Sequence, residues 1–139
     1  MKRLISYRAA GNIAIIAYLL QVIFHILVLL RIVPHEIVWG GRAQSYQELL
    51  PLEIFSLVIN LVAAWLTAAL MGYTGSYSLR KMARIFAGIM FLLFLLNTLG
   101  NLMAVTTTEK LFAIITLVLA LLNLRLVIEP VHENRMPEP

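Results

Sequence analysis

The chain has 139 residues, of which 61% are hydrophobic and only 13% charged, with a formal net charge of +4 and no cysteine. A soluble domain carries about 25% charged residues, so this composition excludes an ordinary soluble protein. The lack of cysteine excludes disulfides, thiolate metal sites and CxxC redox chemistry. The basic residues lie at the ends of apolar segments, which favours membrane headgroups over nucleic acid as their partner.

Four apolar segments, at about 10–30, 52–72, 85–105 and 109–128, can each cross a hydrocarbon core of about 30 Å as a helix. Helices satisfy their own backbone hydrogen bonds in lipid, and continuous apolar runs are unlike the alternating strands of a barrel. We therefore predict an all-α integral membrane protein, in which residues 1–128 form one antiparallel four-helix transmembrane bundle.

The first helix carries small and polar residues at spacings of three and four, which place them on one face: Gly11, Ala14, Tyr18, Gln21 and His25. His25 is a candidate functional residue, because ionisable groups within a membrane are costly and often functional. The alternative is a neutral histidine that donates one hydrogen bond in a packed core. The segment is too long for the apolar region of a signal peptide, so we expect it to be retained.

The connection at 31–51 is the longest, and we expect it to form a compact extracytoplasmic cap. Trp39 is typical of the headgroup zone, as is Tyr46, and Arg42 is suited to binding an anionic group.

The other three helices repeat the spacing of small and polar residues, and we expect these faces to point inward. They comprise Glu53, Ser56, Asn60, Ala63 and Thr67; then Asn97, Gly100, Asn101, Ala104 and Thr108; then Ala113, Thr116, Ala120 and Asn123. Leu19, Leu92 and Leu119 are expected to face lipid. Asn60, Asn97 and Asn123 can alternatively serve as interhelical hydrogen-bonding residues without a ligand. Residues 129–139 contain three prolines and are expected to form a flexible tail.

The basic residues divide unequally between the two sides that four crossings define. One side has Arg31, Arg42 and Lys110; the other has Lys2, Arg3, Arg8, Arg80, Lys81, Arg84, Arg125 and Arg135. Because cytoplasmic loops are enriched in Lys and Arg, we predict a multi-pass protein of the cell membrane with both termini in the cytoplasm.

Depth along the helices gathers the polar residues into the outer half of the bundle, beneath the long connection. The predicted ligand-binding residues are Gln21, His25, Trp39, Arg42, Glu53, Asn60, Asn97 and Asn101. For Glu53 the alternative is a helix N-terminal charge at the interface. No ligand spacing such as HExxH occurs, so we expect no metal and no cofactor, and we assign no catalytic residue.

Three functions remain open. The first is binding or transport of a small molecule, lipid or ion through an outward-facing polar pocket. The second is a structural or accessory subunit that associates with a second copy or with a larger membrane partner. The third is a membrane enzyme acting on a lipid-like substrate, with His25 and Glu53 as acid and base. No motif assigns the chain to a family.

Overall fold

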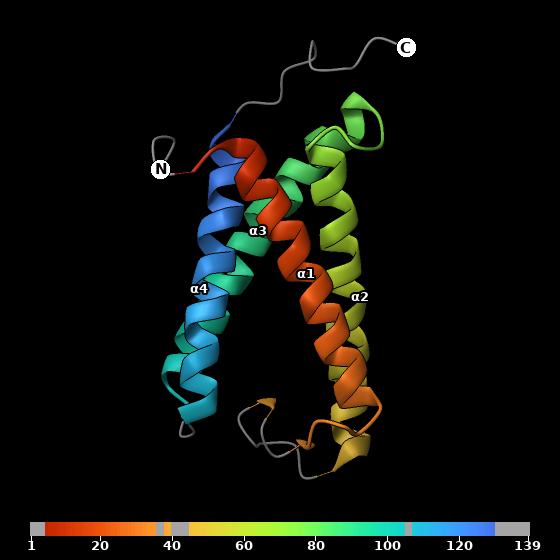
Figure 1. The fold of residues 1–139 in the computed structure, drawn as a ribbon, viewed down its shortest axis with the longest axis vertical. Helices are drawn as coiled ribbons and strands as arrows, with labels where there is room; N and C mark the ends of the chain where they lie inside the picture. Colours follow the sequence, from red (N-terminus) through yellow and green to blue (C-terminus); the bar gives the residue numbers. More distant parts are fainter. Residues whose placement is uncertain (1–4, 36–37, 40–44, 105–106, 130–139) are drawn as a thin grey trace.

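The computed structural model describes residues 5–35, 38–39, 45–104 and 107–129, without the side chains of 108 and 109. These ranges form four helices, α1 (Tyr7–Leu29), α2 (Tyr46–Leu70), α3 (Tyr77–Leu102) and α4 (Thr107–Ile128). All four are long and apolar enough to cross a membrane. Consecutive helices run in opposite directions, as Figure 1 shows. The predicted all-α, antiparallel four-helix bundle is therefore confirmed.

The bundle has two distinct ends. At the termini end, α1 begins, α4 ends and residues 71–76 connect α2 to α3; at the loop end, residues 30–45 connect α1 to α2 (Figure 1). The pairs α1–α2 and α3–α4 make the most extensive contacts, and they diverge toward the loop end (Figure 1). Phe24 of α1 still meets Phe112 of α4 there, with ring centroids 5.9 Å apart.

Serine residues set the beginning of three helices. The side chains of Ser6, Ser45 and Ser76 each accept a hydrogen bond from the backbone N–H three residues later. Because these first turns are partly polar, α2 and α3 begin several residues before the apolar segments at 52–72 and 85–105. Pro51 consequently lies inside α2 in its second turn, where it has no backbone N–H to donate to the carbonyl of Gln47. The connection predicted at 31–51 is therefore shorter, and its residues 36–37 and 40–44 lie outside the described structure.

Small side chains form much of the main core, which allows the helices to approach closely. It contains Ala10, Ala14, Tyr18, Ala63, Ala64, Leu66, Leu70, Ala83, Ala87, Met90, Phe94, Leu119, Ala120, Leu122 and Leu126. The predicted inward faces of α2 and α4 are confirmed by the burial of Ala63, Thr67, Ala120 and Asn123. On α1, Ala14 and Tyr18 are also buried.

The prediction for α3 was wrong. Asn97 and Gly100 are exposed, and the buried face instead carries Arg80, Ala83, Ala87, Met90, Phe94 and Thr98. Alanine permits close packing, and Phe94 lies with its ring centroid 6.0 Å from that of Tyr18 in α1. The side of α3 that faces the core is thus determined by how closely its side chains pack, and not by where its polar residues lie. Leu119 was also wrongly expected to face lipid, because its side chain is only 1% exposed; Leu19 and Leu92 are exposed as expected.

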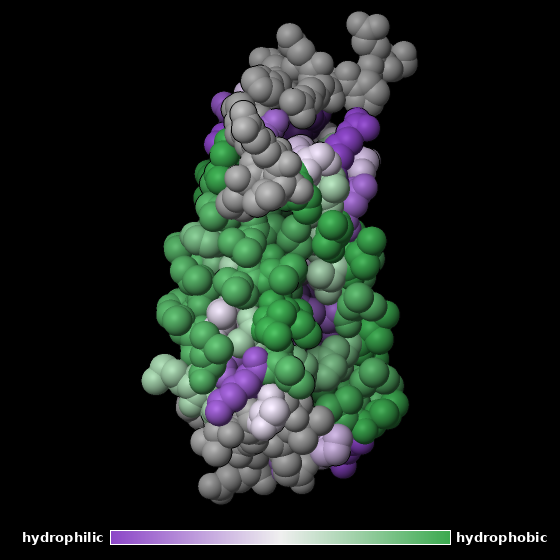
Figure 2. Space-filling model, turned by 60° about the vertical axis from the view of Figure 1, so that its left-hand side comes forward, coloured by the Kyte–Doolittle hydropathy of each residue, from purple (hydrophilic) through white to green (hydrophobic). Residues whose placement is uncertain are grey.

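The surface is hydrophobic along the middle of the visible face and more hydrophilic toward both ends (Figure 2). All four helices contribute exposed apolar side chains, such as Leu20, Phe55, Ile85 and Ile114. A soluble monomer rarely exposes continuous apolar surface on this scale. The fold therefore fits a multi-pass membrane protein.

Candidate functional site at the loop end

A hydrogen-bonded pair of ionisable side chains joins α1 to α2 near the loop end. The imidazole Nδ1–H of His25 donates to Oε2 of Glu53 over 2.7 Å. Glu53 is only 1% exposed, whereas the His25 side chain is half-buried. Burying a carboxylate is energetically unfavourable unless hydrogen-bond donors surround it. The hydrogen bond from His25 therefore offsets part of the cost of burying Glu53. The sequence predicted both residues as members of one site, and the structure brings these two together.

Trp39 supplies the second donor to the same carboxylate. Its indole Nε1–H donates to Oε1 of Glu53 over 2.7 Å. Val38 holds this part of the connection in place, because it is buried with Val28 and Leu49 in a small second core. Trp39 itself has a φ of 54°, in the left-handed region that is unfavourable for large side chains. Both oxygens of Glu53 are therefore fixed by donors from two different segments.

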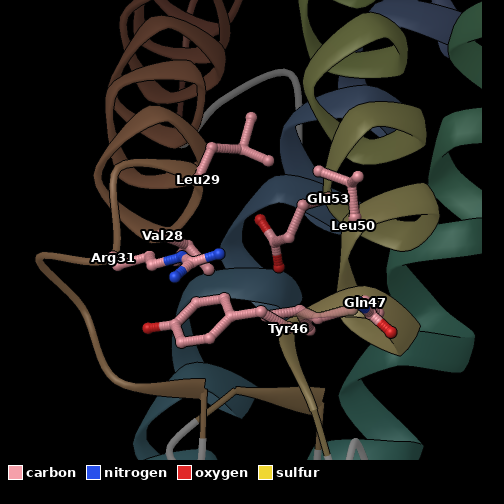
Figure 3. A pocket seen from close by; sticks show the side chains of 8 residues that line it. Val28, Leu29, Arg31, Tyr46, Gln47, Leu50 and Glu53 are labelled. Atoms are coloured by element: carbon pink, nitrogen blue, oxygen red, sulfur yellow. The ribbon is translucent and has the colours of Figure 1, made fainter.

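A cavity of about 120 Å³ adjoins Glu53 at the surface of the loop end. Its walls are formed by Val28, Leu29, Arg31, Tyr46, Gln47, Leu49, Leu50 and Glu53. In Figure 3 the carboxylate of Glu53 and the guanidinium of Arg31 extend toward one another across this space. The cavity thus offers one negative and one positive group on otherwise largely apolar walls.

Arg31 is held on its wall by the end of α1 and by Tyr46. The backbone N–H of Arg31 donates to the Val28 carbonyl, and the backbone N–H of Ile32 donates to the Leu27 carbonyl. These two bonds form the Schellman motif of a helix C-terminus. Arg31 occupies the left-handed position of this motif, with a φ of 60°. Its guanidinium carbon lies 4.9 Å from the centroid of the Tyr46 ring, a cation–π distance. The Tyr46 hydroxyl donates to the Val33 carbonyl at 3.2 Å and so fixes the ring.

The other predicted site residues do not line this cavity. Gln21 is half-buried one turn before His25, and Asn60 is buried two turns beyond Glu53. On α3, Asn97 is exposed and Asn101 half-buried. Arg42 lies outside the described residues. The cavity is therefore built from α1, α2 and their connection, without the predicted contribution from α3.

Sequence reasoning missed Arg31 and Gln47 as cavity residues. Arg31 was counted only as a topological charge. Its basic side chain one residue beyond the last apolar turn, followed by Tyr46 at the start of the next helix, was the available signal. Within the described ranges, no group of three or more histidine, aspartate or glutamate side chains gathers as a metal site.

The middle of the bundle is held by hydrogen bonds between buried side chains. The Tyr18 hydroxyl donates to Oδ1 of Asn123 over 2.9 Å and accepts from its Nδ2 over 2.6 Å. Thr98 donates to the hydroxyl of Thr116 over 2.9 Å, joining α3 to α4. These polar groups are satisfied by one another, so they act as interhelical connections.

Comparison with protein-family models, with curated proteins and with solved structures finds no match to this chain. Its function is therefore inferred from the residues of the cavity.

Proposed function

We propose that this chain is a multi-pass protein of the cell membrane, with cytoplasmic termini, that binds a small zwitterion in the cavity at its loop end. The single observation that supports this most is the buried carboxylate of Glu53, which faces Arg31 across the cavity. A ligand with an ammonium group and an anionic group complements both walls. Such chemistry occurs in an aminophospholipid headgroup and in a free zwitterion of similar size.

Charge complementarity favours a zwitterion over a simple ion. An anion near Arg31 would also lie near the carboxylate of Glu53, and a lone cation would lie near the guanidinium. A zwitterion with a primary ammonium group places one charge against each wall and donates further hydrogen bonds to Glu53. A carboxylate has about four acceptor positions, so the bonds from His25 and Trp39 leave capacity for a ligand.

The apolar walls favour a lipid as the source of this headgroup. Val28, Leu29, Leu49 and Leu50 line the cavity beside the charged groups. A lipid whose headgroup occupies the cavity can extend its hydrocarbon along the exposed apolar surface of α1 and α2, where Ile26 and Ile54 lie.

Binding is favoured over transport by the packing further along the bundle. The pairs Tyr18–Asn123 and Thr98–Thr116 bond the helices to one another in the interior. A ligand that passed through would have to break these buried bonds, each of which is costly to leave unmade.

The test uses the fluorescence of Trp39, which contacts Glu53 directly. Trp65 is replaced by Phe, because it is the other tryptophan and is exposed on α2. The purified protein in detergent is titrated with short-chain phosphatidylethanolamine, phosphatidylcholine and phosphatidylglycerol, and with free phosphoethanolamine. We expect saturable quenching or a spectral shift with phosphatidylethanolamine, and a smaller response with phosphatidylcholine, whose ammonium cannot donate hydrogen bonds.

Variants separate this site from general membrane effects. Glu53→Gln and Arg31→Gln should each weaken binding by at least about tenfold, since each removes one charge-assisted interaction. Glu48→Gln is the matched control, because Glu48 is exposed in the first turn of α2 and does not line the cavity. Equal affinity for the three lipids, or no loss in either cavity variant, would contradict the proposal. Binding of free phosphoethanolamine as tight as that of the lipid would identify a soluble zwitterion as the ligand.

A structural or accessory subunit is the second candidate, and the bonded interior supports it. In that case His25 and Glu53 serve only to join α1 to α2. The variants His25→Gln and Glu53→Gln would then unfold the protein, whereas the binding proposal expects both to fold.

A further inference from the structure

Asn97 lies on the exposed side of α3, among leucines and one turn before Asn101. It is exposed, as are the neighbouring Leu93, Leu96 and Leu99. Arg84, the last basic residue before it on α3, lies 13 positions earlier, which is about 20 Å along a helix. Since the hydrocarbon core is about 30 Å thick, a helix with Arg84 at one boundary places Asn97 well inside it.

The amide of Asn97 has no hydrogen-bond partner within the part of the chain that the structure describes. The two buried asparagines behave differently. Asn60 donates to the carbonyl of Ser56 and Asn123 to that of Leu119, each four residues earlier. Lipid tails offer neither donors nor acceptors, so an exposed amide at this depth needs a partner from another molecule.

The residues around Asn97 form a face suited to another helix. Leu93, Asn97 and Gly100 follow one another within α3 at spacings of four and three, which is the seam of a left-handed helix pair. At Gly100 an added Cβ would meet nothing within 4 Å, so the backbone is open to close approach. These residues, which we call the α3 seam, are largely unused by the core of the bundle.

We infer that the α3 seam is the interface of a homodimer, in which the Asn97 amides of two copies hydrogen-bond across a two-fold axis. An amide carries both donors and an acceptor, so it is complementary to a copy of itself. A two-fold axis brings the same residue of both copies together, which makes each Asn97 the partner of the other. An aliphatic lipid surface cannot supply this interaction.

Cysteine crosslinking tests the geometry, because the chain has no cysteine of its own. Single cysteines are placed at Leu93, Asn97 and Gly100, and as matched controls at Leu92 and Leu99, all exposed on the same helix. The protein is oxidised in liposomes at low density. We expect disulfide-linked dimers at the seam positions and few at the controls. Equal crosslinking of both sets, or none at the seam, overturns the inference.

A second measurement tests the role of the amide. Dimerisation is followed in liposomes by energy transfer between labelled copies as the protein is diluted in lipid. Asn97→Leu should weaken dimerisation by about 3- to 20-fold, the range of measured interhelical hydrogen bonds in membranes. Leu92→Ala is the control and should leave it unchanged. A wild-type protein that remains monomeric at high density, or an Asn97→Leu variant that dimerises equally well, overturns the inference. Ligand binding at Glu53 should be unaffected in either variant.

Discussion

Arg31 and Gly72 occupy equivalent positions at the ends of α1 and α2. Each follows the last helical turn in the left-handed region, with φ of 60° and 81° respectively, and each closes a Schellman motif. Glycine adopts this conformation without strain, whereas another residue costs about 1–2 kcal/mol. The arginine at the end of α1 is therefore unfavourable for the backbone, and its side chain lies on the wall of the cavity.

The variant Arg31→Gly should separate stability from binding. It relieves strain of about 1–2 kcal/mol but removes a cation–π contact with Tyr46 worth about 0.5–1 kcal/mol. We expect the free energy of unfolding, measured in mixed micelles, to be unchanged or up to about 1.5 kcal/mol higher, while zwitterion binding is lost. Gly72→Ala is the converse control and should destabilise by about 1 kcal/mol. Substantial destabilisation by Arg31→Gly would mean that the arginine serves the fold.

Two buried asparagines should respond differently to the same substitution. Asn123→Leu leaves the Tyr18 hydroxyl buried without its partner, which should cost about 1–3 kcal/mol. Asn60 already has an amide oxygen without a partner among the described residues. Asn60→Leu should therefore leave the unfolding free energy nearly unchanged or raise it. Equal losses in both variants would show that the oxygen of Asn60 is satisfied, for example by a buried water molecule.

At the scale of helices, the sequence predicted the membrane spans well. A run of about twenty apolar residues has the length of a transmembrane helix, and few other structures can accommodate it. It predicted the inward faces of α2 and α4, where polar and small residues coincide on one face. It failed on α3, where alanines, Met90 and Phe94 form the core and the more polar seam with Asn97 faces outward. In the site, His25 and Glu53 were predicted from charge and depth. The roles of Trp39 and Arg31 depend on left-handed backbone conformations in the connection between α1 and α2. The spacing of polar residues along a helix, from which the site was predicted, carries no information about such conformations.

The observed faces predict which positions tolerate a larger side chain. Ala63 and Ala120 are buried in the main core, and phenylalanine at either should destabilise the bundle by about 1–3 kcal/mol through overpacking. Leu92 is exposed on α3, so Leu92→Phe should be nearly neutral. Unfolding in mixed micelles measures all three. A neutral Ala120→Phe together with a destabilised Leu92→Phe would mean that α4 and α3 are rotated relative to the structure.

At the scale of the whole molecule, basic residues at the termini end have both structural and topological consequences. Arg84 donates through Nε to the Val127 carbonyl over 2.9 Å, near the end of α4. Arg125 donates to the Ile5 carbonyl over 3.1 Å and pairs with Glu129 over 3.0 Å. Positive charge near the C-terminus of a helix is favourable because of the helix dipole. The same charges resist translocation, so they should keep this end in the cytoplasm.

Labelling of single cysteines tests this orientation on a chain without cysteine. Thr74 is exposed between α2 and α3 at the termini end, and Ile32 is exposed just after α1 at the loop end. In intact cells a membrane-impermeant maleimide should label Ile32→Cys and spare Thr74→Cys, which should react only after the cells are opened. If the pattern is reversed, the cavity beside Glu53 faces the cytoplasm. Its zwitterion would then come from the inner leaflet or the cytosol, and the positive-inside bias would have been overridden in this protein. Labelling of both sites in intact cells would mean that the chain inserts in two orientations, which the unequal distribution of its basic residues argues against.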